Sequence, residues 1–158
     1  MREGEGHEVW RNGDEYRGNY SRDKFEGHGE LTTKSSLYKG QFHENYKSGL
    51  GTILFKSGGR YEGLWQKGRF HGRGVYFWKD GKRYDGEWAD GMRTGSGIMY
   101  LPNGERYDGT WLRNNMHGPG WWRFTNGKVR SGEWKNNEHV RWTGPEQFET
   151  QMNRKKPK

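Results

Sequence analysis

Aromatic residues and glycine alternate with single intervening residues at regular places along the chain. In one such stretch, Tyr61, Gly63 and Trp65 are each separated by one residue. A period of two places all three side chains on the same face of a β-strand. The same stretch begins at Tyr16, Tyr38, Tyr61, Tyr84 and Tyr107, and in a degraded form at Arg130. A second alternating segment follows within each repeat, as in residues 52–55, 75–78, 98–101 and 121–124. The pattern therefore predicts two short strands per repeat.

Turn-forming residues separate these predicted strands. The eighth position of each repeat carries a residue type that tolerates a positive φ: Asp23, Asn45, Gly68, Gly91, Asn114 and Asn137. The second strand ends in a two-residue turn signal at 12–13, 57–58, 80–81, 103–104 and 126–127. Asn-Gly and Asp-Gly between alternating segments are strong hairpin signals. The repeat from Tyr16 is one residue shorter and lacks this glycine.

The predicted fold class is all-β, an elongated single-layer twisted antiparallel β-meander of about 12 strands built from 23-residue hairpin repeats. The array is expected over residues 1–135, with a partial repeat at 1–15, repeats starting at 16, 38, 61, 84 and 107, and a degraded repeat from 130. Residues 136–158 are expected to form a C-terminal cap and basic tail. Pro145 at the start, and Phe148 and Met152 four residues apart, predict a short helix over about 145–154. The alternative is a basic tail alone.

The composition indicates an aromatic core. Only 28% of the residues are hydrophobic and the mean hydropathy is -1.40, yet the chain has nine Trp, nine Tyr and seven Phe. Each of these side chains buries a large area, so few of them suffice for a core. Glycine between two rings leaves room for a neighbouring ring to lie over the backbone. The rings therefore supply the core of a sheet that has no second layer.

The repeats resemble a known family. The stretches "YEGLWQKGRFHGRG", "YDGEWADGMRTGSG" and "YDGTWLRNNMHGPG" are similar to the MORN repeat (membrane occupation and recognition nexus), and the resemblance covers about residues 4–135. It implies an elongated, often curved sheet and a non-enzymatic scaffold or binding role. Members occur in cytoskeletal and division structures, in cilia and flagella, at membrane junctions and fused to lipid kinases. The histidine of the family pattern stands only at His71 and His117 here.

No residue pattern supports catalysis or a cofactor. The chain has no cysteine, and His71 and His117 lie two repeats apart, too far to share a metal. The expectation is no enzyme, no metal and no cofactor. The formal net charge is +8, but four of the cations stand at the C-terminus: Arg154, Lys155, Lys156 and Lys158. The remaining body is only mildly basic, which does not favour nucleic acid. Without a signal peptide or an apolar span, an intracellular protein is expected.

The aromatic face is the first candidate site. A partner's extended segment or amphipathic helix could lie in a groove along it. The predicted groove residues are Tyr61, Trp65, Tyr76, Trp78, Tyr84, Trp88, Tyr107, Trp111 and Trp122. The plainer interpretation is that these rings serve only as core. The opposite face carries a second apolar set, expected to be an interface with a partner or a second copy in a homodimer: Val75, Phe77, Ile98, Tyr100 and Trp121.

Taken together, the residues and the resemblance predict a structural protein-interaction scaffold. It would bind a partner segment within a cytoskeletal, ciliary or membrane-associated assembly. The alternative function is a peripheral adaptor that binds anionic phospholipid through Arg154, Lys155, Lys156 and Lys158. Cations next to an acidic bilayer contribute about 1 kcal/mol each, so such attachment would be weak and sensitive to salt.

Overall fold

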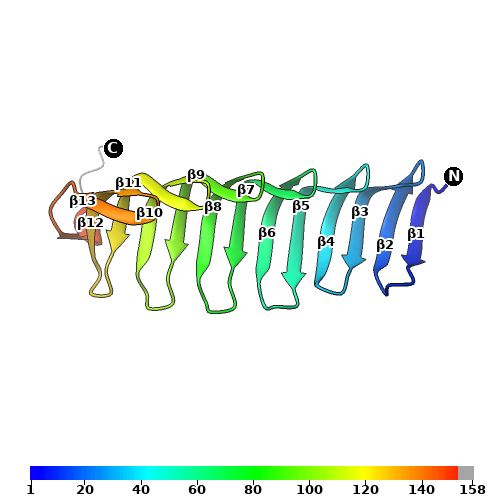
Figure 1. Ribbon diagram of the computed structural model, residues 1–158, viewed down its shortest axis with the longest axis horizontal. Helices are drawn as coiled ribbons and strands as arrows, with labels where there is room; N and C mark the ends of the chain where they lie inside the picture. Colours follow the sequence, from blue (N-terminus) through cyan, green and yellow to red (C-terminus); the bar gives the residue numbers. More distant parts are fainter. Residues whose placement is uncertain (153–158) are drawn as a thin grey trace. The chain divides into compact units, whose positions relative to one another are not determined.

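The structure is a computed structural model that describes residues 1–152, and in this range it is one antiparallel sheet (Figure 1). The strands are β1 (Gly4–Val9), β2 (Glu15–Ser21), β3 (Lys24–Thr32), β4 (Ser36–His43), β5 (Tyr46–Phe55), β6 (Arg60–Gln66), β7 (Arg69–Phe77), β8 (Arg83–Ala89), β9 (Met92–Tyr100), β10 (Arg106–Leu112), β11 (Asn115–Arg123), β12 (Lys128–Lys135), β13 (Glu138–Trp142) and β14 (Gln147–Phe148). They follow chain order from β1 to β13, and β14 pairs with β12. The predicted all-β, single-layer meander is confirmed.

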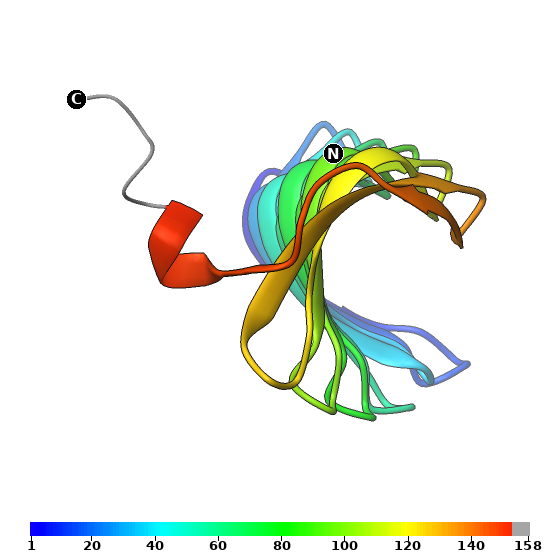
Figure 2. The same cartoon turned by 90° about the vertical axis from the view of Figure 1, so that its left-hand side faces the viewer.

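The chain divides into two compact parts. Among the described residues, the N-terminal part consists of Met1–Lys79 and Trp88–Gly91, and the C-terminal part of Asp80–Glu87 and residues 92–152. Strand β8 contributes residues to both. Within each part the strands are bent along their length rather than straight (Figure 2).

The reversal inside each repeat is a two-residue turn in which both residues have a positive φ. The values are 47° and 71° at Glu44 and Asn45, and 47° and 77° at Lys67 and Gly68. Two successive residues of this kind define a type I′ hairpin turn, whose twist matches that of the flanking strands. The positive φ predicted for the eighth position is thus confirmed. The residue at the seventh position also has a positive φ, although the Glu44 and Lys67 residue types do not predict one.

Except after β3, where residues 33–35 contain no glycine, the reversal between repeats is a three-residue turn closed by a glycine. In the turn after β9, the Gly104 N–H donates to the Leu101 carbonyl at 3.0 Å, and the Leu101 N–H donates to the Glu105 carbonyl at 2.9 Å. Gly104 has a φ of 89°, which identifies a type I turn followed by a glycine bulge. The Asn103 side chain accepts the Glu105 N–H at 3.0 Å and so fixes the turn. The predicted Asn-Gly hairpins are confirmed.

Glycines face one another across neighbouring strands because a tyrosine ring covers them. Gly63 of β6 pairs with Gly74 of β7, and the Tyr61 side chain lies over this pair. A Cβ added to Gly74 would lie 2.2 Å from the Tyr61 Oη, far inside contact distance. Tyr61 has no exposed surface. The recurring glycines therefore leave the space that the rings of the core tyrosines fill.

The C-terminal end differs from the predicted helix at about 145–154. Among the described residues, the helix α1 covers only Glu149–Met152, and β14 precedes it. β13 was not predicted either, because its sequence lacks the glycine pattern of the repeats. Both strands pair with β12, β13 with its second half and β14 with Lys128 and Val129. An outer strand leaves a row of backbone groups unpaired, and these short segments occupy that row.

Candidate functional site

The predicted groove residues of the N-terminal part fall into a buried floor and a more exposed rim. Tyr61 is 0% exposed, Trp65 6% and Trp88 5%. The Tyr61 ring meets the Trp65 ring edge to face at 5.3 Å and the Trp88 ring at 5.5 Å. This arrangement is favourable for aromatic pairs. These three side chains are core, and a partner could touch no more than their edges.

The polar atoms of the floor are satisfied inside the sheet. The Tyr61 hydroxyl donates to the Leu64 carbonyl at 2.7 Å, and burial raises the pKa of Tyr61. The Trp65 indole N–H donates to the Gly51 carbonyl at 3.1 Å, and the Trp88 N–H donates to the Gly74 carbonyl at the same distance. The floor therefore has no spare donor for a ligand.

Tyr76 and Trp78 form the rim of the N-terminal part. Both are half-buried, and their rings lie 4.6 Å apart. Burial raises the pKa of the Tyr76 hydroxyl. Of the five predicted groove residues in this part, these two present ring surface to solvent.

The C-terminal part has the same division. Tyr84, Tyr107 and Trp111 are buried, with the Tyr84 and Trp111 rings edge to face at 5.1 Å. Trp122 is half-buried and lines a cavity of about 330 Å³. The cavity is lined by Met116, Trp122, Phe124, Trp134, Asn137, His139 and Trp142. Its far wall comes from β13, which sequence reasoning missed along with the half-buried Trp142.

A comparison with protein-family models matches the MORN repeat in six consecutive copies. They cover residues 1–15, 16–36, 38–60, 61–83, 84–106 and 107–129. The chain belongs to the MORN-repeat family. The resemblance noted in the sequence is thereby confirmed, while no curated protein matches the chain.

A solved structure with low sequence identity shares the fold. The TCP domain of SAS-4 (dCPAP) from Drosophila melanogaster, in complex with a proline-rich motif of Ana2 (dSTIL), superposes with a TM-score of 0.53 at 10% identity, over 82% of this chain and 72% of that one. The TCP10 domain of Danio rerio CPAP gives a TM-score of 0.49 at 14% identity, over 90% of this chain and 68% of that one. At such identities the likeness concerns the fold alone.

The tenth position of the MORN repeat lies on the aromatic face and varies in chemistry. It is Phe25, Lys47, Phe70, Arg93 and Met116 in the five full repeats. Phe25 stacks on Tyr16 at 3.7 Å, and Phe70 stacks on Tyr61 at 3.8 Å. Sequence reasoning missed this position, although aligning the repeats would have shown two cations where the others carry apolar side chains.

Lys47 extends over rings of the aromatic face. Its ammonium lies 5.4 Å from the Tyr38 ring centroid and 5.8 Å from that of Trp65. It also lines a second cavity, of about 390 Å³, in the N-terminal part. Desolvation by this apolar surrounding lowers the pKa of Lys47.

The second predicted interface is partly covered by arginine. In the N-terminal part, Val75 and Phe77 are half-buried, and the Arg60 guanidinium lies 4.2 Å from the Phe77 ring centroid. In the C-terminal part, Ile98, Tyr100 and Trp121 are half-buried as well. There the Arg83 guanidinium lies 4.0 Å from the Tyr100 ring. Their role as an interface stays a prediction.

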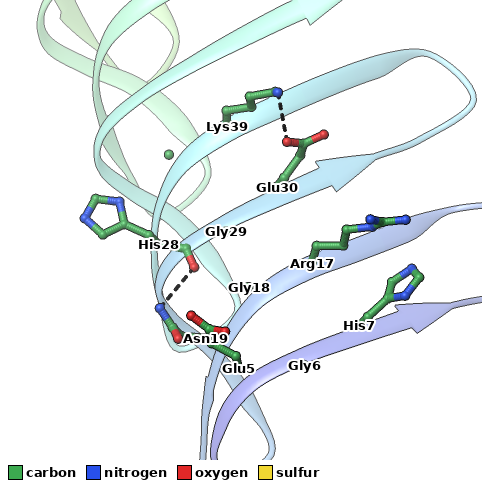
Figure 3. A pocket seen from close by; sticks show the side chains of 11 residues that line it. Glu5, Gly6, His7, Arg17, Gly18, Asn19, His28, Gly29, Glu30 and Lys39 are labelled. Atoms are coloured by element: carbon green, nitrogen blue, oxygen red, sulfur yellow. Dashed lines mark hydrogen bonds and ion pairs between the residues drawn. The ribbon is translucent and has the colours of Figure 1, made fainter.

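The N-terminal part also has a polar hollow on the face opposite its rings. Its floor is the glycine row, with His7, Arg17 and Lys39 on one side and Asn19 and His28 on the other (Figure 3). Lys39 pairs with Glu30 at 2.9 Å, and Arg17 pairs with Glu15 at 2.6 Å. Both cations are thus neutralised within the chain, so the hollow offers a ligand no free charge from them.

The predicted phospholipid contacts cannot be located. Arg154, Lys155, Lys156 and Lys158 lie outside the described residues. Within residues 1–152, no group of three metal-ligating side chains comes together, and none of the helices is long and apolar enough to span a membrane.

Proposed function

We propose that the chain is a non-enzymatic protein-interaction module that holds an extended segment of a partner on its aromatic face. The observation that carries the proposal is the cavity of about 330 Å³ beside Trp122, Trp134 and Trp142. Its outer rings are half-buried, whereas the rings beneath are fully packed. Ligand pockets of this size are typically apolar, preformed and aromatic.

The chemistry of the partner segment follows from the shape of these walls. Proline-rich segments are stiff before they bind, so they lose little entropy, and they dock on aromatic grooves. The solved SAS-4 domain with the same fold is in complex with a proline-rich motif of Ana2. We extend this mode to the present chain and place the module in a cytoskeletal assembly, of which a ciliary one would be a special case.

A library of random displayed dodecapeptides, selected on the immobilised chain, tests the proposal. Proline-containing peptides should be enriched, and Trp122→Ala with Trp142→Ala should weaken binding of the best synthetic peptide by about tenfold or more, or ~1.4 kcal/mol. Val140→Ala is the control, because Val140 is an exposed neighbour of Trp142 on β13.

Either of two outcomes would contradict the proposal. Either no peptide is enriched on the native chain, or enriched peptides bind the double variant as well as they bind the native chain. Thermal unfolding of the variants shows whether the sheet is intact, and each tryptophan replaced by leucine separates loss of the ring from loss of the fold.

A further inference from the structure

Lys47 occupies a place where other repeats put a packed ring. In the repeats from Tyr16 and Tyr61, a phenylalanine at this position stacks directly on the core tyrosine, at 3.7 and 3.8 Å. Lys47 leaves that space partly open and brings an ammonium to the aromatic face, 5.4 Å from the Tyr38 ring centroid. A cation there costs packing that phenylalanine would supply.

The cavity beside Lys47 is apolar and cationic. Its walls include Ile53, Phe55, Trp65 and Phe70, and its charged lining residues are Lys47 and Arg69. No carboxylate lines it. Within residues 1–152, the Lys47 ammonium forms no ion pair, and the groups it contacts are the Tyr38 and Trp65 rings. Burial lowers the pKa of Lys47, because the desolvated ammonium has no counter-charge to stabilise it.

Arg93 shows how a cation at this position can be used internally. It stands at the same place in the repeat from Tyr84, and its guanidinium donates to the Asn114 carbonyl at 2.7 Å. It also lies 5.2 Å from the Trp111 ring centroid. The Arg93 side chain therefore ties one repeat to the next, whereas Lys47 lines a cavity of about 390 Å³.

We propose that this cavity takes an acidic peptide segment of the partner. A glutamate or aspartate carboxylate would meet the Lys47 ammonium, and an adjacent apolar side chain would pack against Phe55 and Phe70. The basis is charge complementarity, because an anion entering an apolar cavity gains most from a cation that has no partner. This inference rests on the proposed function and names the partner's chemistry at a second place on the aromatic face.

The experiment selects the same displayed dodecapeptide library on three proteins: the native chain, Lys47→Gln and Lys47→Phe. Lys47→Gln removes the charge with little change of volume, and Lys47→Phe restores the ring that the other repeats carry. Lys56→Gln is the matched control, because Lys56 is exposed and does not line the cavity. Thermal unfolding confirms that each variant is folded.

The native chain and Lys56→Gln should enrich peptides with Asp or Glu next to an apolar residue. Both Lys47 variants should lose that acidic preference. The best acidic synthetic peptide should bind Lys47→Gln at least tenfold more weakly than it binds the native chain. The same peptide with its Glu replaced by Gln should bind the native chain and Lys47→Gln equally. Binding of the acidic peptide should also raise the pKa of the Lys47 ammonium, as measured by NMR of labelled lysine.

Two results would overturn the inference while leaving the proposed function standing. One is peptide enrichment without acidic residues, and the other is an acidic preference that survives in Lys47→Gln. Preference for phosphoserine over glutamate, or Lys47-dependent binding to vesicles with anionic lipid in place of peptide, would assign the cavity to phosphate instead. Failure to enrich any peptide would contradict the proposed function itself.

Discussion

The tyrosine that opens each MORN repeat is held by its hydroxyl as well as by its ring. The Tyr16, Tyr38 and Tyr61 hydroxyls donate to the carbonyl three residues later, at 2.8, 2.8 and 2.7 Å. Tyr84 and Tyr107 make the same bond at 3.0 Å. The bond spans the glycine between the two aromatic positions. It thus couples the core ring to the bend of its own strand.

Removing one of these hydroxyls should cost stability although the ring remains. Tyr61→Phe leaves the Leu64 carbonyl without this donor and should lower the free energy of unfolding by about 1–2 kcal/mol. Urea unfolding followed by tryptophan fluorescence measures the change. Tyr46→Phe is the control, because Tyr46 is 57% exposed and should change stability by less than about 0.5 kcal/mol. Equal effects of the two variants would contradict a role for the bond.

The same tyrosines predict unfolding in alkali. Burial raises the pKa of Tyr16 and of Tyr107 to about 12, from an ordinary value near 10. Below pH 10 the hydroxyls are protonated in both states and stability is unaffected. Above it the unfolded chain loses protons first, so stability falls between about pH 10 and pH 12.

Unfolding midpoints measured at steps from pH 8 to pH 12, with tyrosinate absorbance recorded in parallel, check this prediction. A midpoint that stays constant through pH 11, or the tyrosinate absorbance of all nine tyrosines appearing near pH 10 before unfolding, would show that these hydroxyls are not protected by burial.

At the scale of strands and turns, the repeats are tied together by the residue that closes each type I′ turn. The Asn45 N–H donates to the Phe25 carbonyl at 3.1 Å, and its side-chain oxygen accepts the Phe25 N–H at 2.8 Å. Asn45 has a φ of 71°. Where glycine stands instead, at Gly68, only the backbone donor remains, at 2.9 Å from the Lys47 carbonyl.

Two substitutions at Asn45 should separate these roles. Asn45→Gly loses the side-chain bond alone and should cost about 1 kcal/mol. Asn45→Ala loses the bond but keeps a Cβ in the left-handed region, without the polar side chain that lets Asn tolerate a positive φ, which should add roughly 1 kcal/mol. Thermal and urea unfolding of both variants provide the comparison, with Gly68→Asn as the reverse change, expected to be neutral or stabilising. An alanine variant as stable as the glycine variant would remove the backbone argument.

The sequence predicted the turns well because the backbone itself demands particular residues there. Glycine or asparagine at a positive φ, as at Gly104 and Asn45, follows from sterics alone and recurs with the repeat. The use of the aromatic face was harder to predict, since period-two patterning places Trp65 and Trp78 on a face without saying which one is buried. The sequence did not predict β13, because this strand pairs with β12 without carrying the aromatic and glycine pattern of the repeats. The role proposed for Lys47 could not be predicted from the sequence, because it depends on the absence of a carboxylate beside Lys47 in the folded chain.

At the scale of the whole molecule, packing in each part is local along the chain. Each strand contacts mainly the strands before and after it, as between β5 and β6 or β10 and β11. Stability of such arrays is approximately a sum over neighbouring repeats. Damage in one repeat should therefore lower protection near it more than in distant repeats.

Replacing a core glycine tests this locality. Gly74→Ala would place a Cβ 2.2 Å from the Tyr61 Oη, and Gly120→Ala would place one 2.5 Å from the Tyr107 Cε2. Each should lower the free energy of unfolding by about 3 kcal/mol, because the tyrosine must leave its site. Hydrogen exchange should show the first variant opening β6 and β7 and the second opening β10 and β11. Gly81→Ala, with no atom within 4 Å of its added Cβ but a φ of 90°, is the control for backbone strain alone. If Gly74→Ala instead accelerates exchange equally in β6 and β11, the molecule unfolds as one cooperative body, and a partner bound on one repeat would stabilise all of them.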